Sequence, residues 1–168
     1  MAVNRIMINQ GDGTFRVSDL DSQADFELFC TSLAMGDVTG DSLPDLFVLN
    51  YSRDPEITRL PKLDPQGNVV DAVAPLSFQP ARDHLYVNQA DGIWKKSPVG
   101  ETQNDAMTGL GIVITDLRSN NPGNEIFVGN DIRRNQFWMR AENQRLTDVA
   151  ALPRKNENTD FLRLPRVY

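Results

Sequence analysis

Two different motifs recur in the chain at the same spacing, and this internal repeat restricts the fold more than any other feature. The stretch "NRIMINQGDGTF" (4–15) recurs as "DHLYVNQADGIW" (83–94), with matched positions at an offset of 79 (88 minus 9). The stretch "GDVTGDSLPDLFVLN" (36–50) is similar to "TDLRSNNPGNEIFVGN" (115–130), again at an offset of 79 (116 minus 37). Two motifs that share one offset indicate a duplicated structural unit that stacks on its neighbour.

A proline-rich insertion explains why one copy of the unit is longer. A third copy of the first motif, "NQFWMRAENQRL" (135–146), follows the second at an offset of only 52 (135 minus 83), and the two offsets differ by 27 (79 minus 52). Residues 52–80 hold five of the ten prolines and show no sustained helical or strand period. We expect a long surface loop there. It is either an insertion tolerated at small entropic cost or a binding loop.

Without the insertion, each unit has the pattern of four short antiparallel strands. Asp-Gly pairs at 12–13 and 91–92 supply the positive φ angles of tight hairpins, and the flanking segments are rich in β-branched, aromatic and aliphatic residues. Four-stranded units of this size are typical of β-propeller blades. The predicted fold is all-β, with residues 1–150 forming a propeller segment made of a half blade (3–18), a blade with the long loop at 52–80 (31–98) and a further blade (108–149).

The predicted propeller is incomplete. The strands account for about two and a half blades, whereas propellers close with about four to eight, and an open end leaves a blade face uncovered. We therefore expect the chain to be part of a longer protein, or to contact the remaining blades or other subunits at its open faces. Residues 151–168 lack the pattern of another hairpin and are predicted to be a tail, and only residues 19–30 could hold a short helical turn.

The acidic turn at 37–45 is the strongest candidate for a metal site. Asp37, Asp41 and Asp45 would repel one another unless a cation lies among them, and Ca²⁺ accepts about six to eight oxygen ligands in flexible geometry. We assign the three carboxylates, the Thr39 hydroxyl (directly or through water) and the Leu43 carbonyl as ligands. An EF-hand is excluded because the loop leads into a strand. The alternative is a metal-free turn in which the Asp side chains cap backbone amides.

The second copy of this turn is predicted to be degenerate. Arg118 stands where the first copy has Thr39, the spacing gains one residue, and asparagines replace most of the acids before Glu125. We expect this turn to hold no metal and to be held by the side chains of Asn120, Asn121 and Asn124.

These motifs resemble the FG-GAP (VCBS-like) repeat of integrin α-subunit propellers and of ASPIC/UnbV proteins related to cartilage acidic protein. The resemblance covers residues 3–149 and departs from the pattern at Ser42, where the pattern has Gly, and in the second turn. It implies a propeller with Ca²⁺ in the loop, a role in adhesion or in binding a protein or glycan ligand, and a secreted, extracellular or periplasmic location. The start of the sequence lacks the apolar h-region of a signal peptide, so we expect no signal peptide in this chain.

Composition argues against a nucleic-acid-binding protein and against a membrane-spanning helix, and the single cysteine and histidine are assigned structural roles. A net charge of −6 disfavours nucleic acid as a partner, and no apolar stretch is long enough for a membrane helix. Cys30 is the only cysteine, and we expect it to be a small buried residue; His84, the only histidine, is interpreted as structural.

Catalytic motifs are sparse, and we expect a binding protein rather than an enzyme. Interaction is assigned chiefly to the long loop, with Tyr51, Arg53, Arg59 and Lys62 as its candidate contact residues. Two alternatives stay open. One is a purely structural subunit of a larger complex; the other is a fragment of a Ca²⁺-dependent propeller enzyme acting on carbohydrate, similar to polysaccharide lyases or sugar dehydratases, in which these residues and His84 would act.

Overall fold

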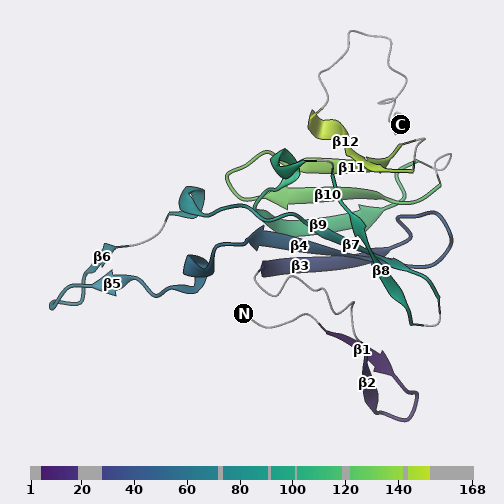
Figure 1. Ribbon diagram of the computed structural model, residues 1–168, viewed down its shortest axis with the longest axis horizontal. Coiled ribbons are helices and arrows are strands. Elements are labelled where there is room, and N and C mark those ends of the chain that lie inside the picture. Colours follow the sequence, from purple (N-terminus) through teal and green to yellow (C-terminus); the bar gives the residue numbers. More distant parts are fainter. Residues whose placement is uncertain are drawn as a thin grey trace, which may run out of the picture.

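The computed structural model describes most of the chain and shows an all-β fold (Figure 1). The described residues are 5–18, 28–71, 74–90, 92–100, 102–118, 122–141 and 144–151. All but the first residue of the predicted tail (151–168) and most of the possible helical turn at 19–30 lie outside these ranges. Within them, no helix is long and apolar enough to cross a membrane.

The first four-stranded sheet contains β3 (Phe29–Gly36), β4 (Asp45–Ser52), β7 (His84–Asn88) and β8 (Trp94–Pro98), antiparallel in that order. All eight residues of β4 are buried, because neighbouring structure covers both faces of this strand. Phe47 and Leu49 point to one face, and Leu46 and Val48 to the other. These strands lie close to the segments predicted from the alternating pattern.

The second four-stranded sheet repeats the arrangement with β9 (Gly109–Thr115), β10 (Glu125–Asn130), β11 (Gln136–Arg140) and β12 (Leu146–Asp148). Two short 3-10 helices, η3 (Gln103–Asp105) and η4 (Val149–Ala151), precede and follow it.

The hairpin turns confirm the repeat and its two offsets. The same backbone bond closes three hairpins: Gln10 N–H to Thr14, Gln89 N–H to Ile93, and Ala141 N–H to Arg145. Their donors are offset by 79 (89 minus 10) and by 52 (141 minus 89). In the first two hairpins the side-chain Oδ1 of Asn9 or Asn88 also accepts a hydrogen bond from the backbone N–H two residues later. The spacing of the sequence motifs is therefore the spacing of equivalent hairpins.

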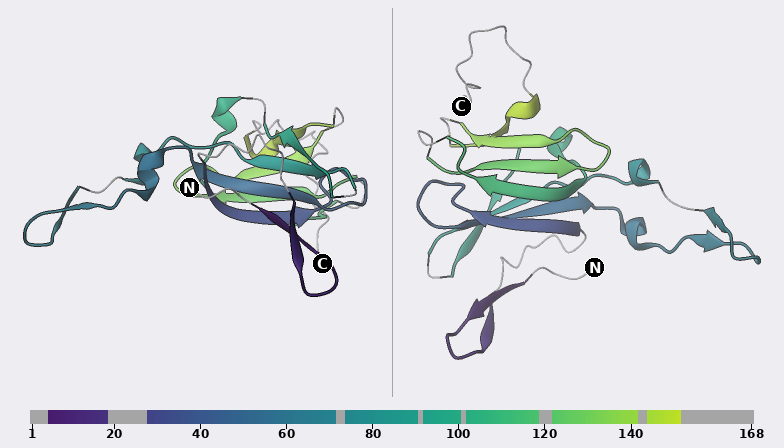
Figure 2. Two further views of the ribbon diagram at one scale, coloured as in Figure 1. Left: turned by 60° about the horizontal axis from the view of Figure 1, so that its bottom comes forward. Right: turned by 180° about the vertical axis from the view of Figure 1, so that it is seen from behind.

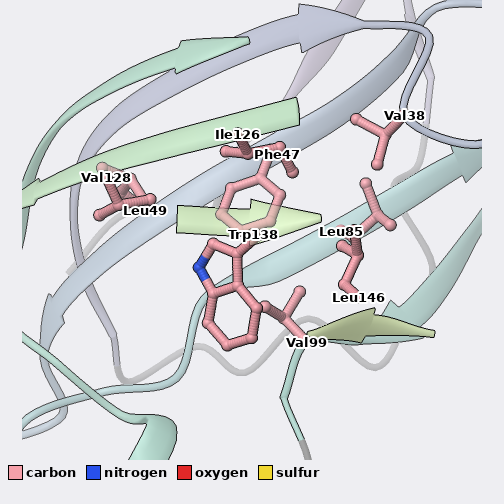
Figure 3. Packing of buried hydrophobic residues seen from close by; sticks show 9 residues of the cluster. All are labelled: Val38, Phe47, Leu49, Leu85, Val99, Ile126, Val128, Trp138 and Leu146. Atoms are coloured by element: carbon pink, nitrogen blue, oxygen red, sulfur yellow. The ribbon is translucent and has the colours of Figure 1, made fainter. Parts of the chain in front are cut away.

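The main core lies between the two sheets (Figure 3). Trp138, the largest fully buried side chain, lies beside Phe47, and both sheets contribute aliphatic residues around them. Full burial of a side chain such as Phe47 contributes about 2–3 kcal/mol relative to exposure. Gly36 allows the sheets to approach, since a Cβ there would lie 2.5 Å from the Ile114 side chain.

The other face of the first sheet is only partly covered. The hairpin of β1 (Ile6–Asn9) and β2 (Phe15–Ser18) lies on this side, and Ile6 packs against a smaller cluster that includes Leu46, Val48 and Tyr86 (Figure 2). Leu33 and Met35, which pair with β4 on the same face, are more than half exposed.

The long loop projects from the two-sheet core and contains more structure than its sequence indicates (Figures 1 and 2). It holds η1 (Pro55–Thr58), β5 (Lys62–Leu63), β6 (Val69–Asp71) and η2 (Pro75–Ser77), with β5 and β6 paired as a short hairpin. The absence of a regular period hid these elements because each is only two to four residues long. We refer to residues 53–79 as the arm.

The expectation that Cys30 is buried is wrong. Cys30 is exposed near the start of β3, and its thiol donates to Asn50 Oδ1 at 2.9 Å. The chain pairs β3 and β4 irregularly here, with register shifts on both sides of Cys30, so the expected in-and-out alternation does not hold.

Candidate metal centre

The acidic turn connects β3 to β4, and the final pair of the two strands, Gly36 with Asp45, closes its base. Its first aspartate also contacts the equivalent turn of the second sheet, because the Asn124 N–H donates to the Asp37 carbonyl at 2.6 Å. The candidate site therefore lies where the two sheets meet, on rigid strand ends.

Asp37 holds the turn in shape. Its Oδ1 accepts the N–H groups of Gly40 (2.6 Å) and Asp41 (3.0 Å), and its Oδ2 accepts the N–H of Ser42 (2.8 Å). An ionised carboxylate has about four lone-pair positions, so three of these bonds leave about one for a further partner.

Asp45 is fully buried and joins three segments. Its Oδ2 accepts the N–H groups of Val38 (3.0 Å) and Thr39 (2.9 Å), and its Oδ1 accepts the N–H of Asn88 at the end of β7 (3.0 Å). Bonds between a carboxylate and buried amides are charge-assisted and strong. Bonds of this kind correspond to the capping alternative, but the sequence did not indicate that Asp45 is fully buried or that it reaches Asn88 of β7.

Asp41 and Thr39 have more unused hydrogen-bonding positions than Asp37 and Asp45. Asp41 is exposed and accepts a single bond, from the Leu43 N–H at 2.9 Å. The Thr39 hydroxyl oxygen is buried and has no hydrogen-bond partner. A buried hydroxyl without a partner is unfavourable, and a cation or a water molecule would satisfy it.

The structure contains one observation that favours metal binding in this turn and one that disfavours it. The unsatisfied Thr39 hydroxyl and the unused lone pairs of Asp41 suit a hard cation. Within the described residues, however, no group of three or more His, Cys, Asp or Glu side chains is arranged to hold a metal ion. The amide bonds of Asp37 and Asp45 match the capping alternative. Ca²⁺ binding therefore stays a prediction.

In the second turn, between β9 and β10, Arg118 stands at the position of Thr39 in the acidic turn. Glu125, buried in β10, accepts the Leu117 N–H at 2.9 Å, and this bond is the repeat equivalent of the bond from Val38 to Asp45, at the same offset of 79 (117 minus 38). Its other oxygen accepts from Arg118 Nε at 2.9 Å. An ion pair thus contributes to holding this turn; Asn120 and Asn121 lie outside the described residues, so the expected role of the asparagine side chains stays a prediction.

Ser42, the departure from the repeat pattern, adopts the left-handed conformation that the pattern's glycine would take, with φ of 70°. A non-glycine residue in this region costs about 1–2 kcal/mol. We expect Ser42→Gly to raise the free energy of unfolding by about 0.5–1 kcal/mol, because the relieved strain exceeds the added freedom of the unfolded chain. Urea unfolding would measure this; Ser32→Gly, within β3, is the matched control and should be destabilising. Loss of stability in Ser42→Gly would contradict the strain.

The candidate contact residues of the long loop fall into two groups. Tyr51 does not belong to the exposed loop, so that assignment is wrong: β4 extends to Ser52, Tyr51 is buried, and its hydroxyl donates to Asp131 Oδ2 of the second sheet at 2.7 Å. Burial, and then this bond, raise the pKa of Tyr51 to about 12. Tyr51 therefore links the two sheets.

The other three residues lie on the arm. Arg53 is exposed at its base and donates through Nε to Gln79 Oε1 at 3.0 Å. Arg59 and Lys62 both pair with Asp71, at 3.1 Å and 3.4 Å, and the Arg59 bond is the main cause that lowers the pKa of the Asp71 carboxyl. These pairs hold the β5–β6 hairpin onto the rest of the arm.

The residues of the enzyme alternative lie on several different elements. His84 lies half-buried in β7 with its ring edge-on to Tyr86, at 6.1 Å between centroids. Tyr51 is buried against the second sheet, and Arg59 and Lys62 lie on the arm.

A buried polar group that the sequence did not indicate lies between β4 and the start of β7. Asp83 is buried and accepts the Asn50 N–H at 2.9 Å, while the fully buried Asn50 donates through Nδ2 to the Arg82 carbonyl at 2.8 Å. Burial raises the pKa of Asp83 to about 7. No local motif distinguishes Asp83 from a surface aspartate, so only the tertiary structure reveals it.

Comparison of the chain with protein-family models, with curated proteins and with solved structures found no match. The resemblance to FG-GAP repeats therefore stays an expectation from the sequence motifs.

Proposed function

We propose that the chain is a segment of a β-propeller of the FG-GAP type that mediates protein or glycan interaction, as an adhesion module in an extracellular or periplasmic setting. Two stacked four-stranded meanders with equivalent hairpins are compatible with two consecutive blades. The β1–β2 hairpin, on the outer face of the first sheet, would be the outer half of a preceding blade.

The observation that carries an interaction role is the exposed apolar surface of the arm. Five aliphatic residues there are more than half exposed, although the arm projects away from the core: Leu60, Leu63, Val69, Val70 and Leu76. Exposed apolar side chains gathered on one projecting segment mark interaction sites in soluble proteins. The ion pairs at Asp71 and the bonds at Arg53 hold the segment in shape, which reduces the entropy lost on binding.

The arm can be removed without cutting the core, and this supplies the test. Ser52 bridges Pro80, and the Arg53 N–H donates to Gln79 at 3.2 Å, so the two ends of the arm lie side by side. An armless variant replaces residues 54–78 with a short glycine-containing turn. We expect its free energy of unfolding to stay within about 1 kcal/mol of the wild-type value, because the arm adds little to the core.

Binding is compared between the full chain and the armless variant on a panel of immobilised glycans and proteins of the extracellular matrix. The proposal predicts retention that depends on the arm and crosslinks from a photoreactive residue at position 63. Equal retention of both proteins, or retention of neither, would overturn the assignment of the arm.

We further propose that the acidic turn binds Ca²⁺ and thereby stiffens the blade. Asp37, Asp41 and Asp45 with the Thr39 hydroxyl and the Leu43 carbonyl would hold the ion. Support comes from the unsatisfied Thr39 oxygen and from the second turn, where the Arg118 guanidinium lies against the buried Glu125 carboxylate. The ion would supply positive charge among the three carboxylates of the first turn.

A purely structural role in a larger assembly is the second candidate, and the uncovered sheet faces favour it. Leu33 and Met35 are exposed on the outer face of the first sheet, and Val113 pairs with Phe127 on the outer face of the second, where both are largely exposed. Light scattering would test it: the wild type should self-associate with rising concentration, and Phe127→Lys should reduce the mass. A wild type that stays monomeric throughout would count against this candidate.

A further inference from the structure

A cavity of about 430 Å³ lies between the outer strands of the two sheets, and arginines converge on it. β7 and β8 form one wall, and Arg140 at the end of β11 with residues 144–146 at the start of β12 forms the other. Arg82, Arg140 and Arg145 all line it, together with the hydroxyl-bearing Ser97. A cavity with this many cations is unusual in a chain whose net charge is −6.

Two hydrogen bonds orient the Arg82 guanidinium, and several of its N–H donors remain unused by the described residues. One of its terminal nitrogens donates to the carbonyls of Val99 (2.7 Å) and Gly100 (2.9 Å). A guanidinium has five N–H groups, so three remain, and the described part of the chain provides no other partner for them. Because two bonds already orient the group, a ligand would not have to order it.

Two carboxylates among the described residues near the cavity accept hydrogen bonds from backbone amides. Asp45 lies behind Val38 and Thr39 with its oxygens directed to backbone amides. Asp105, beside Gly100, accepts the Thr102 N–H at 2.8 Å. Neither Arg82 nor Arg140 forms an ion pair with any described residue.

We propose that this cavity binds the phosphate or sulfate group of a small organic ligand. The planar fork of an arginine matches the oxygens of a tetrahedral oxoanion, and partial enclosure between the sheets strengthens such charge-assisted bonds. Leu85, Val87 and Leu146 also line the cavity, and they provide an apolar surface for the body of the ligand. The volume lies within the range typical of small-molecule sites. This site is separate from the arm, and Val38 and Thr39 of the acidic turn form part of its lining.

The test is a titration of the full chain with inorganic phosphate and inorganic sulfate at constant ionic strength, followed by calorimetry and by amide NMR spectra. We expect saturable binding and shifts of the Ser97 and Gly100 amide signals. Glucose 6-phosphate, glucose 6-sulfate and glucose then distinguish the two oxoanion sources, and glucose should not bind.

Arg140→Gln should weaken binding by about tenfold or more, since it removes one charge-assisted contact. Arg16→Gln, on the exposed β1–β2 hairpin, removes the same charge elsewhere and should bind like the wild type. Equal weakening in both variants would overturn the proposal, as would wild-type NMR shifts that do not saturate or that miss the cavity. The wild-type spectra decide the question even where Arg140→Gln fails to fold.

Discussion

Asp45→Asn is expected to lower the free energy of unfolding by about 3–5 kcal/mol, because a buried carboxylate that accepts three amide bonds loses both its charge and one acceptor oxygen. Asparagine can direct its carbonyl oxygen either to Val38 and Thr39 or to Asn88. Its NH₂ group then faces the other donors, and at least one buried N–H is left without an acceptor.

Urea unfolding in the presence of a chelator measures this effect separately from any metal. Asp41→Asn is the matched control, because Asp41 is exposed in the same turn and accepts one bond; we expect a loss of about 1 kcal/mol or less. Similar losses in the two variants would contradict the structural role of Asp45.

Asp83→Asn is expected to stabilise the protein at pH 8 by about 2–4 kcal/mol and to have little effect at pH 4. Burial raises the pKa of Asp83 from 3.8 to about 7, so the folded state binds more protons than the unfolded state between these values. Stability is therefore lost as pH rises through this window, and the full penalty, roughly 4 kcal/mol, is present above it. Asparagine removes the charge and still offers Oδ1 to the Asn50 N–H.

The measurement is the difference in unfolding free energy between Asp83→Asn and the wild type at several pH values from 4 to 8. Because exposed carboxyl groups titrate alike in both proteins, the difference reports Asp83 alone. A difference that does not grow with pH, or a variant that is less stable at pH 8, would contradict an elevated pKa in the folded state.

The strands were predictable because their signals are local. Alternation of apolar residues, the Asp-Gly turns and the common offset indicated both four-stranded sheets and the β1–β2 hairpin, and the left-handed φ of Ser42 follows from its alignment with glycine in the repeat pattern. A repeat also restricts the alternatives, since equivalent segments must take equivalent structures.

The errors share one cause, which is that burial and partners depend on residues distant in the sequence. Tyr51 is buried next to Asp131, which follows β10 far along the chain and accepts a hydrogen bond from its hydroxyl, and Asp83 is buried beside Asn50, where the chain returns after the arm. Cys30 is exposed because the register shifts at the start of β3. The arm hairpin was missed because such short strands carry no period.

Calorimetric titration of Ca²⁺ into the metal-stripped chain tests the central claim, that the acidic turn is a cation site within a propeller segment. Asp41→Asn removes a carboxylate at small structural cost, and Asp12→Asn, in the exposed turn between β1 and β2, is the control of equal charge. The account predicts one site in the wild type and in Asp12→Asn, lost or greatly weakened in Asp41→Asn. A folded wild type that binds no Ca²⁺, or binding that survives unchanged in Asp41→Asn, would contradict it and identify the turn as a cap for backbone amides.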